Sequence, residues 1–200
     1  MTADANGTTP YDWRFDSGRI CLDLIATSDP GSGPEPLLDS QLLGRWLLGV
    51  GLLPAGTSVS LVDGPWAVRF VDLRLWIDQV IRAELGGRYA DSALERVNAV
   101  ASGSPPPIRA VRKGSGPLVR ALGAAPECGA LLAAVARDAV DLLTDPDALA
   151  RLRECEGESC RRVYLDTSRG RRRRWCSSEV CGNRERVARH RRRAAAIARA

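Results

Sequence analysis

The chain has 200 residues, of which 44% are hydrophobic, and this content excludes an intrinsically disordered protein. The net charge of +5 is divided unevenly: residues 151–200 hold sixteen arginines and six acidic residues, a net +10, whereas residues 1–150 carry −5. The longest apolar run, residues 42–53, contains Arg45 and three glycines and is too short to cross a bilayer. We therefore expect an acidic body and a basic tail that suits a polyanionic partner.

The first ten residues indicate in which cellular compartment the protein is expected. Residues 1–10 are polar and lack the basic and apolar regions of a secretion signal, so we expect a soluble cytoplasmic protein. Residues 1–12 are expected to form a loose tail. Disulfides are rare in a reducing cytosol. Cys21 and Cys128 are interpreted as ordinary buried thiols.

Residues 19–27 predict a largely buried strand, because apolar side chains alternate onto both of its faces. Asp23 is the unusual residue in this run. It is either a hydrogen-bonded structural carboxylate or a contact to a ligand, and the residues alone leave both roles open.

Helices are expected to dominate the rest of the body. N-caps, helical spacing of apolar residues and glycine or proline stops support this reading. The predicted helices span residues 39–50, 63–85, 91–101, 126–143 and 145–153. Residues 108–112 and 118–122 predict a hairpin. The sequence thus predicts an α+β fold, with a mainly helical domain over residues 13–150 and a small sheet.

Four cysteines near the end of the chain form two close pairs. They are Cys155, Cys160, Cys176 and Cys181, spaced C-x4-C-x15-C-x4-C. Two thiol pairs at this separation match tetrahedral coordination of Zn²⁺, with one knuckle for each pair. Two disulfides or four unrelated thiols are the alternatives, and a site of three cysteines and one histidine would need His190, the only histidine, to fold back. We predict one Zn²⁺ per chain.

The surrounding residues predict a small finger over residues 151–200. Residues 163–165 and 172–175 are expected to pair as a hairpin, and a helix with Ser177 or Ser178 as its N-cap is expected to follow. This order is treble-clef-like. A narrow apolar stripe is expected to pack the helix on the finger or the body; it consists of Val180, Val187, Ala194 and Ala198.

Arginines follow the expected hairpin and the last helix. The candidate nucleic-acid contacts are Arg171, Arg172, Arg173, Arg174, Arg184, Arg186, Arg189, Arg191, Arg192 and Arg193. Guanidinium groups bind phosphates and guanine edges, and a single helix fits the DNA major groove better than the narrow groove of RNA. We predict duplex DNA as the partner, and the alternatives are a solvated basic face or a basic C-terminus that contacts the acidic body. One small finger reads few base pairs, so specific binding is expected to need a homodimer.

The segment Cys181-Gly182-Asn183-Arg184 resembles the signature of bacterial CGNR zinc-finger proteins, and residues 164–168 and 173–176 agree with it. The resemblance implies a DNA-binding transcription regulator in which an N-terminal ABATE domain binds a ligand. Residues 21–27 look like the start of that domain, although Ala26 stands where family members commonly carry Asn. Asp23 and Thr27 are the candidate ligand-binding residues.

No stretch carries recognisable catalytic chemistry, because one histidine excludes most Ser-His and Cys-His designs and there is no P-loop or GxGxxG. We therefore expect a zinc-dependent DNA-binding transcription regulator, not an enzyme, with an N-terminal domain that senses a small molecule. The alternatives are an RNA-binding zinc-ribbon-like protein and an enzyme with a catalytic N-terminal domain and a structural finger.

Overall fold

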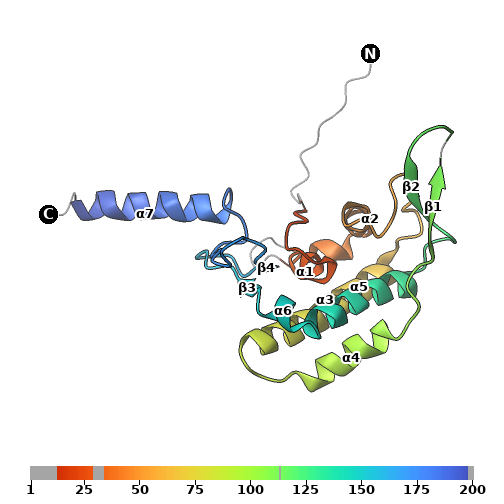
Figure 1. Cartoon of the computed structure of the whole chain (residues 1–200), viewed down its shortest axis with the longest axis horizontal. Coiled ribbons are helices and arrows are strands. Elements are labelled where there is room, and N and C mark those ends of the chain that lie inside the picture. The colour runs from red at the N-terminus through yellow and green to blue at the C-terminus, as the bar shows by residue number, and fades with distance from the viewer. Residues whose placement is uncertain (1–12, 29–33, 113, 198–200) are drawn as a thin grey trace, which may run out of the picture.

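The computed structural model describes residues 13–28, 34–112 and 114–197. These residues form seven α-helices, one short 3-10 helix and two two-stranded antiparallel sheets, so the predicted α+β class is confirmed (Figure 1). The tail expected over residues 1–12 lies outside the described residues. None of the helices in the described ranges combines the length and the apolar character that a bilayer crossing needs.

The predicted helices over residues 39–143 and the first hairpin are present. The elements are α2 (Ser40–Gly49), α3 (Gly64–Leu85), α4 (Asp91–Ala101), β1 (Ile108–Arg112), β2 (Leu118–Leu122) and α5 (Cys128–Leu143). Asp39 accepts hydrogen bonds from the backbone N–H groups of Gln41 and Leu42, and Asp63 accepts one from that of Trp66. These side chains satisfy N–H groups that would otherwise lack partners at a helix start.

Residues 19–27 were predicted as a strand, and this prediction is wrong: they contain helix α1 (Ile20–Ile25). The backbone N–H of Asp23 donates to the carbonyl of Arg19, and that of Ala26 donates to Leu22, both at 3.0 Å. Helices α3 and α5 pack against α1, and its side chains are buried on every side. A short run without an exposed face does not show whether its period is helical or extended.

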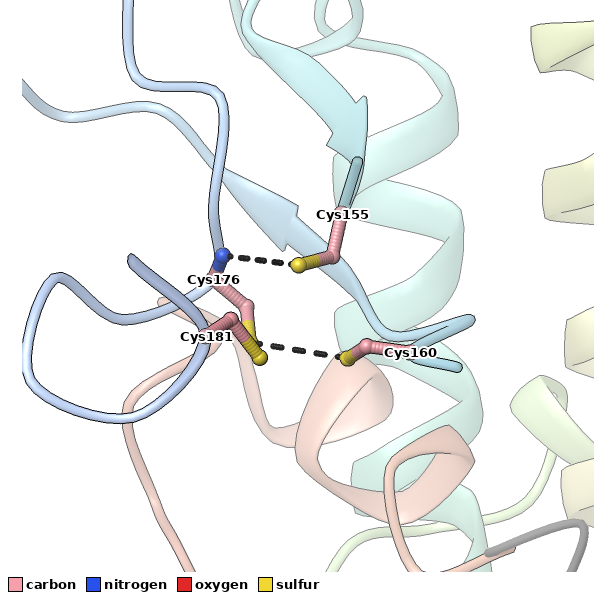
Figure 2. Close-up of side chains that lie close together, drawn as sticks. All are labelled: Cys155, Cys160, Cys176 and Cys181. Atoms are coloured by element: carbon pink, nitrogen blue, oxygen red, sulfur yellow. Dashed lines mark hydrogen bonds between the residues drawn. The ribbon is translucent and has the colours of Figure 1, made fainter. Parts of the chain in front are cut away.

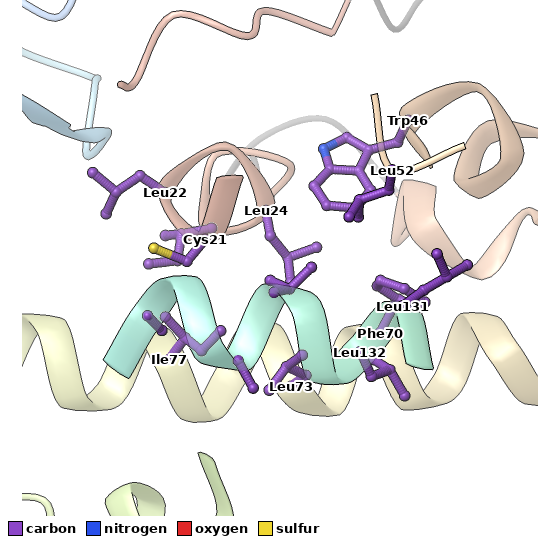
Figure 3. Packing of buried hydrophobic residues seen from close by; sticks show 14 of the residues in the cluster. Cys21, Leu22, Leu24, Trp46, Leu52, Phe70, Leu73, Ile77, Leu131 and Leu132 are labelled. Carbon is purple, nitrogen blue, oxygen red and sulfur yellow. The ribbon is translucent and has the colours of Figure 1, made fainter. Parts of the chain in front are cut away.

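A single apolar core fills the body between α1, α2, α3 and α5 (Figure 3). Trp46 meets Phe70 edge to face, with 6.0 Å between ring centroids. Cys21 and Cys128 are buried free thiols, as predicted, and burial raises the pKa of both. Val163, from the zinc-finger part of the sequence, belongs to the same core.

The second sheet corrects two further predictions. The helix expected over residues 145–153 ends early, as α6 (Pro146–Leu149), and a strand follows it. This strand, β3 (Leu152–Glu154), pairs antiparallel with β4 (Val163–Leu165), so β4 does not pair with residues 172–175. Pairing with β3 places Leu152 and Val163 in the body core. The charged residues 172–174 could not take the place of β3, because burying a charge in an apolar core is unfavourable in free energy. The remaining elements are η1 (Pro36–Leu38) and α7 (Cys181–Ile197).

Candidate metal centre and nucleic-acid interface

The four predicted cysteine ligands come together at one point of the finger (Figure 2). Their sulfur atoms all lie within 4.8 Å of one another. The Cys160 and Cys176 sulfurs are 3.8 Å apart, and those of Cys176 and Cys181 are 3.6 Å apart. His190 is exposed along α7 and is not part of the cluster.

These separations fit a tetrahedral Zn²⁺ site. Sulfurs about 2.3 Å from an ion at tetrahedral corners are about 3.8 Å from each other. A disulfide would need an S–S distance of about 2.05 Å, and all four cysteines are free. The donor set therefore consists of four thiolates, as predicted, and the site holds one zinc ion.

Local structure positions each sulfur. Cys155 follows β3, and its backbone N–H donates to the carbonyl of Arg162, while the N–H of Cys160 donates to Gly157. The backbone N–H of Cys176 donates to the Cys155 sulfur at 3.3 Å. A Cβ on Gly157 would lie 3.3 Å from that of Cys160, so the first knuckle needs a small residue there.

The thiols perturb one another. A hydrogen bond with the Cys176 thiol lowers the pKa of Cys160 to about 5, and this contact between the two thiols raises the pKa of Cys176. Burial raises the pKa of Cys181 to about 11. Zinc binds the thiolate form, so its binding displaces the protons that these groups carry.

A small second core surrounds the cysteines. Tyr164 is buried in it, and Trp175 and Val180 pack against it. The Arg173 guanidinium lies 4.7 Å from the centre of the Tyr164 ring and donates to the carbonyls of Trp175 and Cys176. The N–H groups of Arg173 whose partners are described thus form hydrogen bonds within the finger. This core and the metal together hold the knuckles.

The other predicted arginines are mainly exposed. Arg184, Arg186, Arg189, Arg191 and Arg192 are distributed along α7. The side chain of Arg193 lies outside the described part. Arg171 and Arg172 lie in the loop before the second knuckle, whereas Arg174 pairs with Glu156, with 2.6 Å between Nε and Oε2.

Helix α7 extends away from the body (Figure 1). The apolar stripe predicted to pack it is therefore only partly used. Val180 packs on the finger, but Val187 is 42% exposed and Ala194 is exposed, while Ala198 lies outside the described residues. The stripe prediction is wrong at Val187 and Ala194, whose side chains are exposed.

The two candidate ligand residues are buried. Asp23 accepts a hydrogen bond from the Ser17 N–H at 3.0 Å and lies 3.5 Å from Arg162. Burial raises the pKa of Asp23, although the hydrogen bond from Ser17 and the charge of Arg162 both favour the ionised carboxylate. The Thr27 hydroxyl donates to Leu24 and accepts from Arg74 Nη1 at 3.1 Å. Both side chains thus contact arginines, and a ligand-binding role for Asp23 and Thr27 stays a prediction.

Arginines at the junction of body and finger did not emerge from the sequence. Arg82 of α3 donates to the Arg161 carbonyl at 3.0 Å and lies 3.4 Å from Glu154. Arg162 pairs with Asp16 at 2.9 Å. No local pattern marks these pairs, because their members are far apart in the sequence.

Comparison with known proteins finds two family models that match the chain. Residues 18–146 match the model of the ABATE family, described as "Putative stress-induced transcription regulator". Residues 151–194 match the CGNR zinc finger. No curated protein matches the chain in sequence. Since the first match alone covers more than half of the chain, the protein belongs to the ABATE family and carries a CGNR zinc finger at its C-terminal end.

Proposed function

We propose that this protein is a zinc-dependent transcription regulator that binds duplex DNA through its finger and α7, and that its N-terminal domain senses a small molecule. The observation that carries the proposal is α7: a projecting helix with exposed arginines on several sides and no packing partner beyond the finger among the described residues. A helix that is polar all round buries no apolar face, and exposed guanidinium groups bind phosphates. The regulator description of the family supports the same interpretation.

The dimensions suit the major groove. A helix of 17 residues is about 25 Å long, and a groove about 12 Å wide admits one helix. Arginines on opposite sides of α7, such as Arg189 and Arg191, can then reach phosphates on both strands. Arg171 and Arg172, in the loop before the second knuckle, add contacts to the phosphate backbone of the DNA.

The test is the binding of the zinc-loaded full chain to duplex DNA over a range of salt concentrations. If about six phosphates are neutralised, log K against log salt should have a slope near −5. Changing Arg189, Arg191 and Arg192 together to Gln should flatten that slope by about two to three. The control removes the same charge from the body, through Arg69, Arg88 and Arg109, and should leave the slope unchanged.

Two outcomes would contradict the proposal. Equal slopes for the two triple variants would show that α7 does not face DNA. Tighter binding to an RNA hairpin than to duplex DNA would favour the RNA-binding alternative. We further propose that two copies occupy a two-fold operator, because one finger contacts few base pairs. A strictly monomeric complex on a specific site would refute this last part.

A further inference from the structure

A cleft of about 520 Å³ lies between the body and the finger. The C-terminal end of α1 and one face of α3 form its body side, and the two knuckles with the start of α7 form its finger side. Six arginines line it: Arg14, Arg74, Arg82, Arg161, Arg162 and Arg184. Asp78 is the one carboxylate in the lining, counted over the described residues.

The cleft is larger than the metal site at its edge. Cys160, Cys176 and Cys181 line one end, where the zinc ion belongs. Pockets for small molecules occupy about 300–1,000 Å³, and one ion fills only a small part of such a volume. The remainder has room for an organic molecule.

Several of the arginines are held in place by groups outside the lining. Arg74 is 3% exposed, donates to both carboxylate oxygens of Glu35, and also donates to Thr27. Its Nε is buried without a hydrogen-bond partner among the described residues. Arg162 is held by Asp16 and by the Ser17 hydroxyl, which accepts from its Nε at 3.0 Å. The guanidinium groups are therefore oriented in advance, which lowers the entropy lost on binding.

The charge balance limits what the cleft can bind. Four thiolates on one Zn²⁺ carry a net charge of about −2, and carboxylates such as Glu35 and Asp16 offset further positive charge. Arg184 makes no ion pair with another described residue, and the side chain of Arg161 is 70% exposed beside its single described partner, Glu154. Five carboxylates of the described chain pair with five of the six arginines, so the cleft as a whole is close to neutral. The donors left for a ligand are mainly those of Arg184 and Arg161, which suit one small anionic group, not a polyanion. Ile25, Leu75 and Val180 add apolar surface to the same lining.

We propose that this cleft binds a small organic anion, with a carboxylate or phosphate held by the arginines and an apolar portion against Leu75 and Val180. The inference rests on the ligand sensing proposed above and gives it a place and a ligand class. The ligand would touch α3 and the base of α7 together. Its binding therefore favours one orientation of α7 relative to the body, which couples the cleft to DNA affinity.

The first test is calorimetric titration of the zinc-loaded full chain with benzoate, phenyl phosphate and benzamide. At least one of the two anions should bind at one site per chain. Benzamide has the shape of benzoate without its charge, and it should bind at least about tenfold more weakly than the anion that binds, because charge-assisted hydrogen bonds are lost. Absence of binding by both anions, or equal binding of benzamide, would overturn the proposal.

The second test locates the site with a matched pair on α3. Leu75 lines the cleft and Val68 lies two turns away outside it; both side chains are about half exposed, so neither variant threatens the core. Leu75→Glu should weaken anion binding about tenfold or more, because it places a like charge beside the ligand. Val68→Glu should leave binding unchanged. Equal effects of the two substitutions would place the anion elsewhere and refute the cleft.

The two proposals fail separately. Titration with anions needs no DNA, so a chain that binds DNA but none of the probes keeps its proposed function and loses this inference. A chain that binds an anion in the cleft but no nucleic acid keeps the site and loses the DNA-binding function. Where both hold, a saturating anion should change DNA affinity by roughly 5- to 150-fold in wild type, and Leu75→Glu should abolish that change.

Discussion

At the scale of single residues, the pair of Arg74 and Glu35 shows how one buried charge fixes a local arrangement. Arg74 lies on α3 and Glu35 precedes η1, where Glu35 also accepts a hydrogen bond from the Leu37 N–H. Breaking a buried ion pair costs more than the pair contributes, because the remaining charge is left without a partner. The stability of this region should therefore depend strongly on Glu35.

Glu35→Gln should lower the free energy of unfolding by about 2–3 kcal/mol, less than the full cost of a broken buried pair because the Glu35 side chain is 25% exposed. Burial alone would raise the pKa of Glu35, but its hydrogen bonds with Arg74 and Leu37 outweigh burial and lower it. The stability from ionised Glu35 is thus present above the unfolded pKa of about 4.3 and is lost as the pH falls through the lowered folded pKa. Urea unfolding at several pH values measures both effects.

The control for this prediction is Glu84→Gln on the exposed surface of α3, which should change stability by less than about 0.5 kcal/mol. If Glu35→Gln and wild type lose stability equally as the pH falls through the range in which Glu35 titrates, the pair with Arg74 contributes nothing to acid stability.

Cys160→Ser should remove zinc and disorder the two knuckles, while α1 to α5 and the body core that contains Val163 remain folded. The apparent free energy of structural zinc binding is on the order of 10–16 kcal/mol, and the small core around Tyr164 depends on it. Metal analysis and circular dichroism measure the two effects. Cys128→Ser is the matched control, because it changes a buried thiol of the body and should leave the zinc content at one per chain. Retention of zinc by Cys160→Ser would contradict the assignment of four cysteine ligands.

At the scale of elements, the helices and sites that depend on interactions between near neighbours in the sequence could be predicted. Caps such as Asp39 and Asp63 act on groups two or three residues away, so α2 and α3 could be located from the sequence. The cysteine spacing likewise identified the metal centre. Helix α1 could not be assigned because it is buried on all sides. The partner of β4 and the arginine cleft depend on contacts between distant parts of the chain, which periodicity does not report.

Helix α7 should gain helical content when DNA binds. Isolated helices of this length are marginal in water, and neighbouring arginines repel one another along the helix. Phosphates would neutralise that repulsion. Far-ultraviolet circular dichroism should therefore show a stronger helical signal with duplex DNA, and a chain that ends at Ala188 should show no such gain. Binding by the full chain without any change in the helical signal would show that α7 is fully formed beforehand.

At the scale of the whole molecule, the body and the finger share structure instead of being joined by a linker. The Leu165 N–H donates to the Ser17 carbonyl at 2.9 Å, and the Asp166 N–H donates to Arg151 at 2.8 Å. Val163 lies in the body core. An orientation signal from the cleft would therefore travel through β3 and β4, not through rotation of a helix over residues 145–153.

Val163→Ala should destabilise the body although the residue lies in the finger segment. It is 1% exposed, and removing buried methyl groups should cost about 1–3 kcal/mol of unfolding free energy. Thermal unfolding followed through α-helical circular dichroism measures this loss. Val187→Ala, at an exposed site on α7, is the matched control and should change stability by less than about 0.5 kcal/mol. An unchanged melting temperature for Val163→Ala would show that the shared core is not cooperative.

The β3–β4 pair also determines how fingers could be exchanged between related proteins. A chimaera joined between residues 146 and 151, where the two family segments meet, would combine Leu152 and Val163 of one parent with the body core of another. A crossover within residues 167–170 would keep that shared core in one parental form. The second parent would then supply Arg171, Arg172, α7 and two of the four cysteines. In this family, recombination that splits the metal site between parents should preserve folding better than recombination at the boundary between the segments.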